Sequence, residues 1–355
     1  LSLAPGAEAE EVVAPSEVGQ TRVLRYVNLL CHFPDLESSP IAPEMFSAWH
    51  MGGDWTDSGG PVNSMRHYFY TVSYGNLRIE FTTVSEWRAM SITYAEAEGK
   101  FHWMVPDNCP RAFRDIVDFG QYDGVQMITD GWWPRSYGSA SYSLGAGGRK
   151  PMTVINVMGY FAETGYYHDV FAHEIGHSLG EPHANNSDSD EWPYDNKWDI
   201  MSGSPCSDPK HLGGGLFCLA NDFAANHKLN QGWIAPQRIR TIDGGGDVTL
   251  NLDWLPLGGV SSNYAVAVIP ISDDHYFTIE SRTNEPPATY DLSMPGTAVI
   301  IHDVQERRDE PAWQVGADSD AASESGGGVW LSGETYTNNG LGFAVEILAG
   351  TATGY

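Results

Sequence analysis

The sequence predicts an α+β protein in which a region of mixed helices and strands is followed by a β-rich, sandwich-like C-terminal domain. Hydrophobic residues make up 41% and aromatic residues 12% of the 355 residues, which is typical of a folded chain that buries a substantial core. Helix-like and strand-like patterns alternate up to about residue 240. Beyond that point, short apolar runs separated by Gly, Pro, Asn and Ser predict strands.

Three parts are expected along the chain. Residues 1–20 are acidic and rich in Pro and Ala, which predicts a flexible tail or the remnant of a propeptide. Residues 21–243 are expected to form the first domain and residues 247–355 the β-rich one, because the glycine run between them separates two different patterns. The start lacks a basic segment followed by an apolar core, so any secretion signal is expected to have been removed already.

Apolar periodicity predicts the individual elements. Alternating or continuous apolar runs indicate strands, whereas apolar residues three or four positions apart indicate helices. In the first domain, the expected strands are 22–33, 77–87, 124–129 and 152–158, and the expected helices are 62–72, 110–119 with Pro110 in the first turn, 166–179 and 216–229. Residues 138–148, rich in Gly and Ser, are expected to form a loop. In the second domain, the expected strands are 248–252, 264–269, 276–280, 298–302 and 343–348.

The most informative motif is His173-Glu174-Ile175-Gly176-His177-Ser178-Leu179-Gly180-Glu181-Pro182-His183, which has the spacing HExxHxxGxxH. On a helix, His173 and His177 are four residues apart and share a face, so both imidazoles can reach one metal ion. Gly180 can adopt the left-handed conformation that ends the helix and turns the chain back, which makes His183 a third ligand. Three protein ligands leave a fourth position for water, as in catalytic zinc sites.

Glu174 is the expected catalytic residue of this site. Zinc lowers the pKa of a bound water to about 7, and the neighbouring carboxylate is placed to take its proton as a general base. The alternative is that these are ordinary helix histidines satisfied by hydrogen bonds. However, five fixed positions make a chance occurrence of the whole pattern rare.

The eleven-residue motif resembles the signature of the metzincin clan of zinc endopeptidases. The clan's second element, a methionine turn, has a counterpart in Trp198-Asp199-Ile200-Met201-Ser202-Gly203. The resemblance implies that Met201 lies beneath the three histidines as an apolar floor without binding the metal, and the alternative is a core methionine that fills a gap. Some metzincins use a tyrosine two residues after this methionine as an extra ligand. Gly203 stands there in this chain, so the turn is expected to provide no tyrosine ligand.

Further stretches are similar to secreted proteases of the immune inhibitor A and gametolysin types. They are residues 22–24 and 31–35, 73–77, 227–234 and 276–282, so the resemblance extends over most of the chain from about residue 21. Immune inhibitor A-type enzymes commonly have aspartate as the third ligand, and His183 therefore favours the gametolysin-like side. The resemblance implies that residues 21–243 are a catalytic domain with a mixed twisted sheet, an active-site helix and a helical lower subdomain.

The function implied by the resemblance is that of a secreted zinc endopeptidase, which hydrolyses peptide bonds in extracellular proteins or glycoproteins. The strand at 152–158 would be the sheet edge that pairs with an extended substrate, because an edge strand offers unpaired N–H and C=O groups. The alternative is a fully paired core strand. The competing function is a non-catalytic, zinc-stabilised adhesion or carbohydrate-binding protein, although metal binding alone would not require Glu174.

The segment between His183 and the methionine turn is dense in oxygen ligands. Asp188, Asp190, Asp195 and Asp199 are candidate calcium ligands, because calcium binds about six to eight oxygen atoms. Their spacing is not that of an EF-hand loop, and a solvated acidic loop is the alternative.

The four cysteines, Cys31, Cys109, Cys206 and Cys218, allow three full pairings. None belongs to a CxxC pair, and histidines already provide a zinc site, so disulfides are expected in place of a second metal site. Cys206 with Cys218 would close a short loop after Met201, which leaves Cys31 to pair with Cys109. Such bonds require folding in an oxidising compartment, as expected of a secreted protein.

The net charge of −27 limits the partners that are expected. It repels polyanions, so neither nucleic acid nor an anionic membrane is expected, and no apolar run reaches the roughly 18 residues needed for membrane insertion. The acidity can attract cations or cationic substrates or maintain solubility, and a solvated acidic surface is its plainest explanation. Exposed aromatic side chains of the C-terminal domain are candidates for glycan contact, with core packing as the alternative. A monomer that acts on a protein or peptide substrate is expected.

Overall fold

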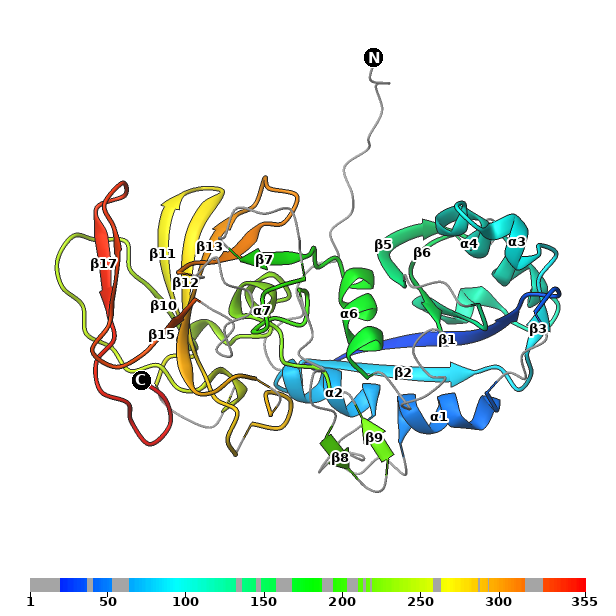
Figure 1. The fold of residues 1–355 in the computed structure, drawn as a ribbon, viewed down its shortest axis with the longest axis horizontal. Coiled ribbons are helices and arrows are strands. Elements are labelled where there is room, and N and C mark those ends of the chain that lie inside the picture. Colours follow the sequence, from blue (N-terminus) through cyan, green and yellow to red (C-terminus); the bar gives the residue numbers. More distant parts are fainter. Residues whose placement is uncertain are drawn as a thin grey trace, which may run out of the picture.

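The computed structural model contains two large β-sheets, with most of the helices around the first (Figure 1). It describes residues 20–36, 41–52, 64–131, 136–144, 148–157, 168–186, 194–202, 210–212, 215–217, 219–257, 263–286, 288–292, 294–316 and 328–355. The tail expected at 1–20 lies outside these residues apart from its last position. Separate sheets with few, short helices agree with the expected α+β class.

The first sheet has the strand order β2-β1-β4-β6-β5, and the short β3 also pairs with β1. Its strands are β1 (Arg22–His32), β2 (Leu77–Thr83), β3 (Arg88–Ala89), β4 (Gly124–Thr129), β5 (Tyr137–Ser143) and β6 (Arg149–Asn156). All neighbours are parallel except β5 and β6, which are antiparallel. Every residue of β4 is buried, as expected of a central parallel strand.

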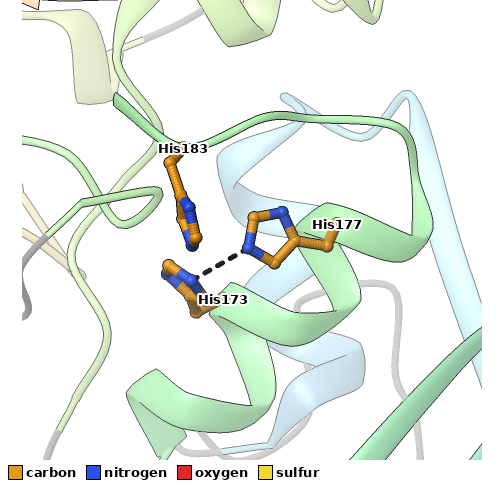
Figure 2. Close-up of side chains that lie close together, drawn as sticks. All are labelled: His173, His177 and His183. Carbon is orange, nitrogen blue, oxygen red and sulfur yellow. Dashed lines mark hydrogen bonds between the residues drawn. The ribbon is translucent and has the colours of Figure 1, made fainter. Parts of the chain in front are cut away.

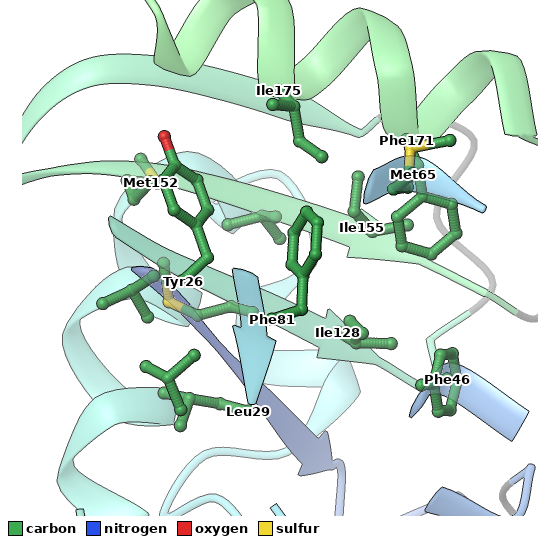
Figure 3. Packing of buried hydrophobic residues seen from close by; sticks show 14 of the residues in the cluster. Tyr26, Leu29, Phe46, Met65, Phe81, Ile128, Met152, Ile155, Phe171 and Ile175 are labelled. Atoms are coloured by element: carbon green, nitrogen blue, oxygen red, sulfur yellow. The ribbon is translucent and has the colours of Figure 1, made fainter. Parts of the chain in front are cut away.

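Different helices cover the two faces of this sheet (Figure 1). Helices α1 (Pro43–Met51), α2 (Met65–Val72) and α6 (His168–Ser178) pack on one face, and α4 (Phe101–Ala112), after the short α3 (Tyr94–Ala97), packs on the other. Alternation along β1 accounts for this arrangement. Tyr26 hydrogen-bonds to Ser178 of α6, whereas Cys31, an odd number of positions away, is bonded to Cys109 of α4. Figure 3 shows buried side chains where α1, α2 and α6 pack on the sheet.

The second sheet has the order β10-β11-β12-β13-β14-β7, and β15 pairs with β13. Its strands are β7 (Ala184–Asn186), β10 (Ile239–Thr241), β11 (Val266–Ser272), β12 (His275–Arg282), β13 (Ala298–Gln305), β14 (Ala312–Gln314) and β15 (Val329–Trp330). The middle strands are antiparallel, while β10 and β7 run parallel to their neighbours at the two edges. A hairpin of β16 (Thr335–Asn338) and β17 (Phe343–Glu346) places Tyr336 and Phe343 against Phe277 of this sheet.

The helix expected at 110–119 lies earlier in the chain. It is α4, which spans Phe101–Ala112, so Pro110 is in its last turn and not in its first. Val105, Cys109 and Phe113 recur every four residues and are fully buried. The burial of this apolar stripe outweighs the backbone hydrogen bonds that are lost at the two prolines inside the helix.

The loop expected at 138–148 is a strand for much of its length. It is β5, the antiparallel edge of the first sheet. Consequently β6, the strand expected at 152–158, is paired on both sides and is not the sheet edge, so the alternative of a fully paired strand is the correct one. The glycine at 138 does not indicate a turn; it allows α6 to approach closely.

The helix expected at 216–229 is much shorter. It is α7, which spans Ala225–Asn230, and residues 215–217 form β9 (Gly215–Phe217), paired with β8 (Lys210–Leu212). The backbone N–H groups of residues 222–225 donate to side-chain carboxylates. The acceptors, in chain order of the donors, are Asp291, Asp222, Asp199 and Glu280. These side-chain bonds replace the helical ones. Residues 248–252 form only one bridge, from Leu252 to Tyr264, and no strand.

The second sheet takes strands from both sides of the expected domain boundary. Both β7 and β10 precede residue 243, and β7 directly follows His183. The division into domains 21–243 and 247–355 stays a prediction. In the described part of the chain, no helix combines the length and apolarity needed to cross a bilayer.

Candidate metal centre

Helix α6 carries the first two histidines of the motif and ends where the motif requires. Gly180 has a φ of 97°. Its N–H donates to His177 O at 3.0 Å, and the N–H of Glu181 donates to Gly176 O at 3.1 Å, so the helix ends in a Schellman motif. The left-handed glycine turns the chain so that His183 comes back over His173 and His177 (Figure 2).

Three ring nitrogens converge at this turn. One nitrogen from each of His173, His177 and His183 lies within 4.8 Å of the others. The Nε2 atoms of His173 and His177 are 3.1 Å apart. Two nitrogens bound tetrahedrally to one zinc ion at about 2.0 Å would be roughly 3.3 Å apart, so the observed distance suits two ligands of one ion. Among the described residues, this is the only group of three or more His, Cys, Asp or Glu side chains close enough together to hold a metal ion.

The remaining ring nitrogens determine which atoms face the centre. His173 Nδ1 donates to Ile200 O and His177 Nδ1 donates to Glu181 O, both at 2.7 Å. Because a carbonyl can only accept, each Nδ1 carries the proton and each Nε2 presents a lone pair. Two lone pairs facing each other at 3.1 Å repel unless a cation lies between them. The donor set and its tautomers therefore fit a bound metal ion.

Burial keeps the three rings neutral. Together with the nearby His183, it lowers the pKa of His173 to about 4. Burial also lowers the pKa of His177 well below its usual value, with a smaller effect of the other two rings, and it lowers the pKa of His183. Neutral imidazole is the form that binds metals, so no proton has to leave the rings when an ion binds at neutral pH.

Glu174 follows His173 in α6 and is buried. Its Oε2 atom has no hydrogen-bond partner in the described part of the chain. Burial raises the pKa of Glu174 well above its usual value, because an ionised carboxylate is costly in surroundings that do not solvate it. A buried oxygen of this kind has the capacity to bind a water molecule or to take up a proton.

Met201 packs against the underside of α6. It is fully buried, and a Cβ atom at position 176 would lie only 2.4 Å from its Sδ atom. Gly176, which the motif leaves unspecified, therefore provides the space for this methionine. The preceding residue, Ile200, supplies the carbonyl that orients His173, so the methionine turn lies beside the cluster. That Met201 acts as a floor for a bound metal stays a prediction.

The edge strand β5 lies against the same helix. At Gly138, a Cβ atom would be 2.1 Å from Glu174 O and 2.7 Å from His177 Cβ. Within the described residues, β5 pairs with no strand other than β6. An edge of the first sheet is therefore next to the histidines.

Tyr194 is a residue near the cluster that the sequence did not indicate. Its hydroxyl lies 3.3 Å from His183 Nε2, and the two rings are 5.1 Å apart. No tyrosine was expected from the methionine turn, and this one comes from the segment before it. No spacing rule marks position 194, so only the fold brings it to notice.

The four candidate calcium ligands have different positions. Asp188 and Asp190 lie outside the described residues, and Asp195 is half-buried. Asp199 is fully buried, and its carboxylate accepts hydrogen bonds from Met201 N at 3.0 Å and from His227 Nε2 at 2.9 Å. Asp199 therefore holds the methionine turn, and calcium binding stays a prediction.

A buried ionic group lies behind the metal cluster. His227 of α7 pairs with both Glu181 and Asp199. Burial alone would lower the pKa of His227, but the charge of Asp199 and hydrogen bonds to both carboxylates raise it to about 10. Burial alone would raise the pKa of Asp199, but the charge of His227 and its hydrogen bond lower this pKa to about 2. The sequence marked residue 227 only as the start of a family-like stretch.

Cys31 and Cys109 form the disulfide that was expected, which ties α4 to β1 on the face of the sheet away from α6. The second expected pair, Cys206 with Cys218, lies outside the described residues. A disulfide is typical of proteins that fold in an oxidising compartment.

Comparisons with known proteins give no assignment. A scan against models of protein families found no match. A search of curated proteins found none either. Function must therefore be inferred from the residues and geometry of this chain.

Proposed function

We propose that this protein is a secreted, zinc-dependent endopeptidase of the metzincin type, which hydrolyses peptide bonds in extracellular proteins or glycoproteins. The observation that carries the proposal is the cluster of His173, His177 and His183, with Glu174 beside it in the same helix. Catalytic zinc sites have three protein ligands, whereas structural sites are closed by four. In the described part of the chain, no fourth His, Cys, Asp or Glu side chain joins the three histidines.

A bound zinc ion would polarise the substrate carbonyl and lower the pKa of a water molecule to about 7. Glu174 moves the protons: its Oε2 atom takes one from the attacking water and then delivers it to the leaving amide nitrogen. A C–O bond forms and the C–N bond breaks, and the second proton of the water also passes to the amine, so one water yields a carboxylate and an ammonium group. The Nδ1 bonds of His173 and His177 would keep both rings oriented to hold such an ion.

The edge strand β5 supports cleavage within a chain. The side of its backbone away from β6 pairs with no strand in the described part of the sheet, so an extended peptide can add there. Because Gly138 lies against Glu174 and His177, such a peptide would run past the histidines. This mode of binding needs no chain end. The disulfide between Cys31 and Cys109 supports secretion.

The proposal is tested with wild type, Glu174→Gln and Glu98→Gln on a library of denatured proteins. Glu98 is an exposed carboxylate and serves as the matched control. We expect Glu174→Gln to cleave about 10²–10⁴-fold more slowly, since this is the typical contribution of general acid–base catalysis. Glu98→Gln should match wild type, and elemental analysis should find the same zinc content in all three.

Two results would contradict the proposal. Cleavage by zinc-loaded Glu174→Gln at the wild-type rate would remove the base from the mechanism. Zinc binding without any cleavage by wild type would favour the adhesion or carbohydrate-binding alternative.

The same elemental analysis, after purification in calcium buffer, tests the expected calcium site, and an absence of calcium counts against it.

A further inference from the structure

His227 is a buried histidine whose two ring nitrogens both meet carboxylates. Nδ1 lies 2.6 Å from Glu181 Oε2, and Nε2 lies 2.9 Å from Asp199 Oδ2. All three side chains are almost completely inaccessible to solvent. The ring donates in two opposite directions, which only a doubly protonated imidazole can do toward ionised carboxylates.

The two carboxylates belong to the two segments that orient the metal-facing histidines. The backbone carbonyl of Glu181 accepts the hydrogen bond from His177 Nδ1. The residue after Asp199 is Ile200, whose carbonyl accepts from His173 Nδ1. One side chain therefore connects the two backbone acceptors that turn the Nε2 atoms of His173 and His177 toward each other.

Neighbouring groups make this connection rigid. Asn230, the last residue of α7, and Gln231, which follows it, also donate to the carboxylate of Glu181. The second oxygen of Asp199 accepts from Met201 N, which ties the methionine turn to the same group. The link thus joins α7, the turn after α6 and the methionine turn.

We propose that His227 is a positioning residue of the metal centre, which holds Glu181 and Asp199 together so that the carbonyls of residues 181 and 200 keep His177 and His173 aimed at one ion. The inference rests on the proposed function only in requiring that the three histidines bind zinc. His227 itself touches neither ion nor substrate. It acts on metal affinity through the outer hydrogen bonds that fix ligand orientation.

Glutamine at position 227 cannot replace the histidine. Both of its N–H donors are on one nitrogen, so they cannot reach the two carboxylates that the ring contacts from Nδ1 and from Nε2, and the amide carries no charge. Glu181 and Asp199 would then be two buried negative charges without the cation between them, and their repulsion would separate the segments that carry the two carbonyls.

The test compares the zinc dissociation constants of wild type, His227→Gln and His302→Gln by competition with a chromophoric chelator. His302 is an equally buried histidine of β13 that has no hydrogen bond to Glu181 or Asp199 among those found in the described residues, so it controls for the loss of a buried imidazole. We expect zinc to bind His227→Gln about 10–100-fold more weakly, the usual cost of removing an outer partner of a ligand. His302→Gln should bind zinc like wild type. Equal zinc affinity of the two variants would overturn the inference.

Folding and the proposed function are separated within the same experiment. Circular dichroism of the zinc-free proteins shows whether each variant is folded, and cobalt(II) absorption reports the ligand geometry, which a purely structural role would leave unchanged. If His227→Gln does not fold, Glu181→Gln is measured in its place, with the same weakening expected and unchanged affinity as the refuting result. Failure of the metal site itself would appear as no zinc binding by wild type, and failure of the protease proposal as zinc binding without cleavage.

Discussion

Glycines at three positions shape the metal centre, each for its own physical reason. Gly180 is needed for its backbone conformation, because a φ of 97° is unfavourable for any residue with a Cβ atom. Gly176 and Gly138 are needed for space, since a Cβ atom at either would collide with Met201 or with the backbone of α6. The HExxHxxGxxH motif specifies only Gly180 among them.

Replacement of Gly176 by alanine distinguishes space from helix propensity. Alanine favours a helix over glycine by about 1 kcal/mol, so propensity alone predicts stabilisation. We expect a lower free energy of unfolding instead, because the new methyl group would meet Met201 Sδ at 2.4 Å and overpacking costs about 1–3 kcal/mol. Urea denaturation measures the difference. A stabilised variant with wild-type zinc affinity would show that Met201 yields without cost.

At the scale of elements, the candidate active site depends on two neighbours of α6. The strand β5 lies along one side of the helix, and the methionine turn lies under it. Helix α4 covers the opposite face of the sheet and is held by the disulfide. The contact between β5 and α6 therefore sets the distance from the sheet edge to the histidines.

Gly138→Ala should push β5 away from α6. A Cβ atom 2.1 Å from Glu174 O forces a backbone shift, so we expect unfolding to become easier by about 1–3 kcal/mol and KM for peptides to rise. Gly245→Ala is the control, because its Cβ atom would meet nothing within 4 Å. Urea denaturation and steady-state kinetics measure the two effects. If both variants behave like wild type, β5 does not limit substrate binding in the way proposed here.

At the scale of the whole molecule, buried charges connect the second sheet to the segment before the methionine turn. Arg282 of β12 is fully buried and donates to Asp291 from Nε at 2.8 Å and from an Nη atom at 2.7 Å. It also donates to Glu280 at 2.8 Å and to the carbonyl of Trp198, just before the methionine turn, at 2.9 Å. The strand β7 adds a second connection, because it leads from His183 into the second sheet. The three histidines therefore lie between α6, which packs on the first sheet, and β7 of the second sheet.

Arg282→Leu should lower the free energy of unfolding by about 3–5 kcal/mol, because it leaves Glu280 and Asp291 buried without a cation. Arg307→Leu is the matched control: its partner is Asp274, and its side chain is 87% exposed, so a change of no more than about 1 kcal/mol is expected. Thermal and urea denaturation give both values. Similar losses in the two variants would mean that the buried network adds no more than a surface pair.

Local patterns were sufficient for the parts of the site that are close in sequence. His173 and His177 share a helix face because of helical geometry, and Gly180 ends that helix, so the ligand cluster could be predicted without a fold. The strands at 22–33 and 124–129 were likewise evident from short segments rich in apolar residues. The disulfide between Cys31 and Cys109 belonged to one of three possible pairings, and it was preferred because Cys206 and Cys218 are close in sequence.

Contacts between distant parts of the chain determined the rest. Whether β5 or β6 forms the sheet edge depends on strand pairing, which a glycine- and serine-rich sequence does not reveal. The bond between Glu181 and His227 spans 46 residues, and that between Tyr194 and His183 follows no local spacing. The sequence by itself therefore determined the metal-binding motif, because its geometry is that of one helix and one turn. Only the tertiary structure decided which side chains orient the ligands and which strand lies beside them, because those positions depend on packing between elements.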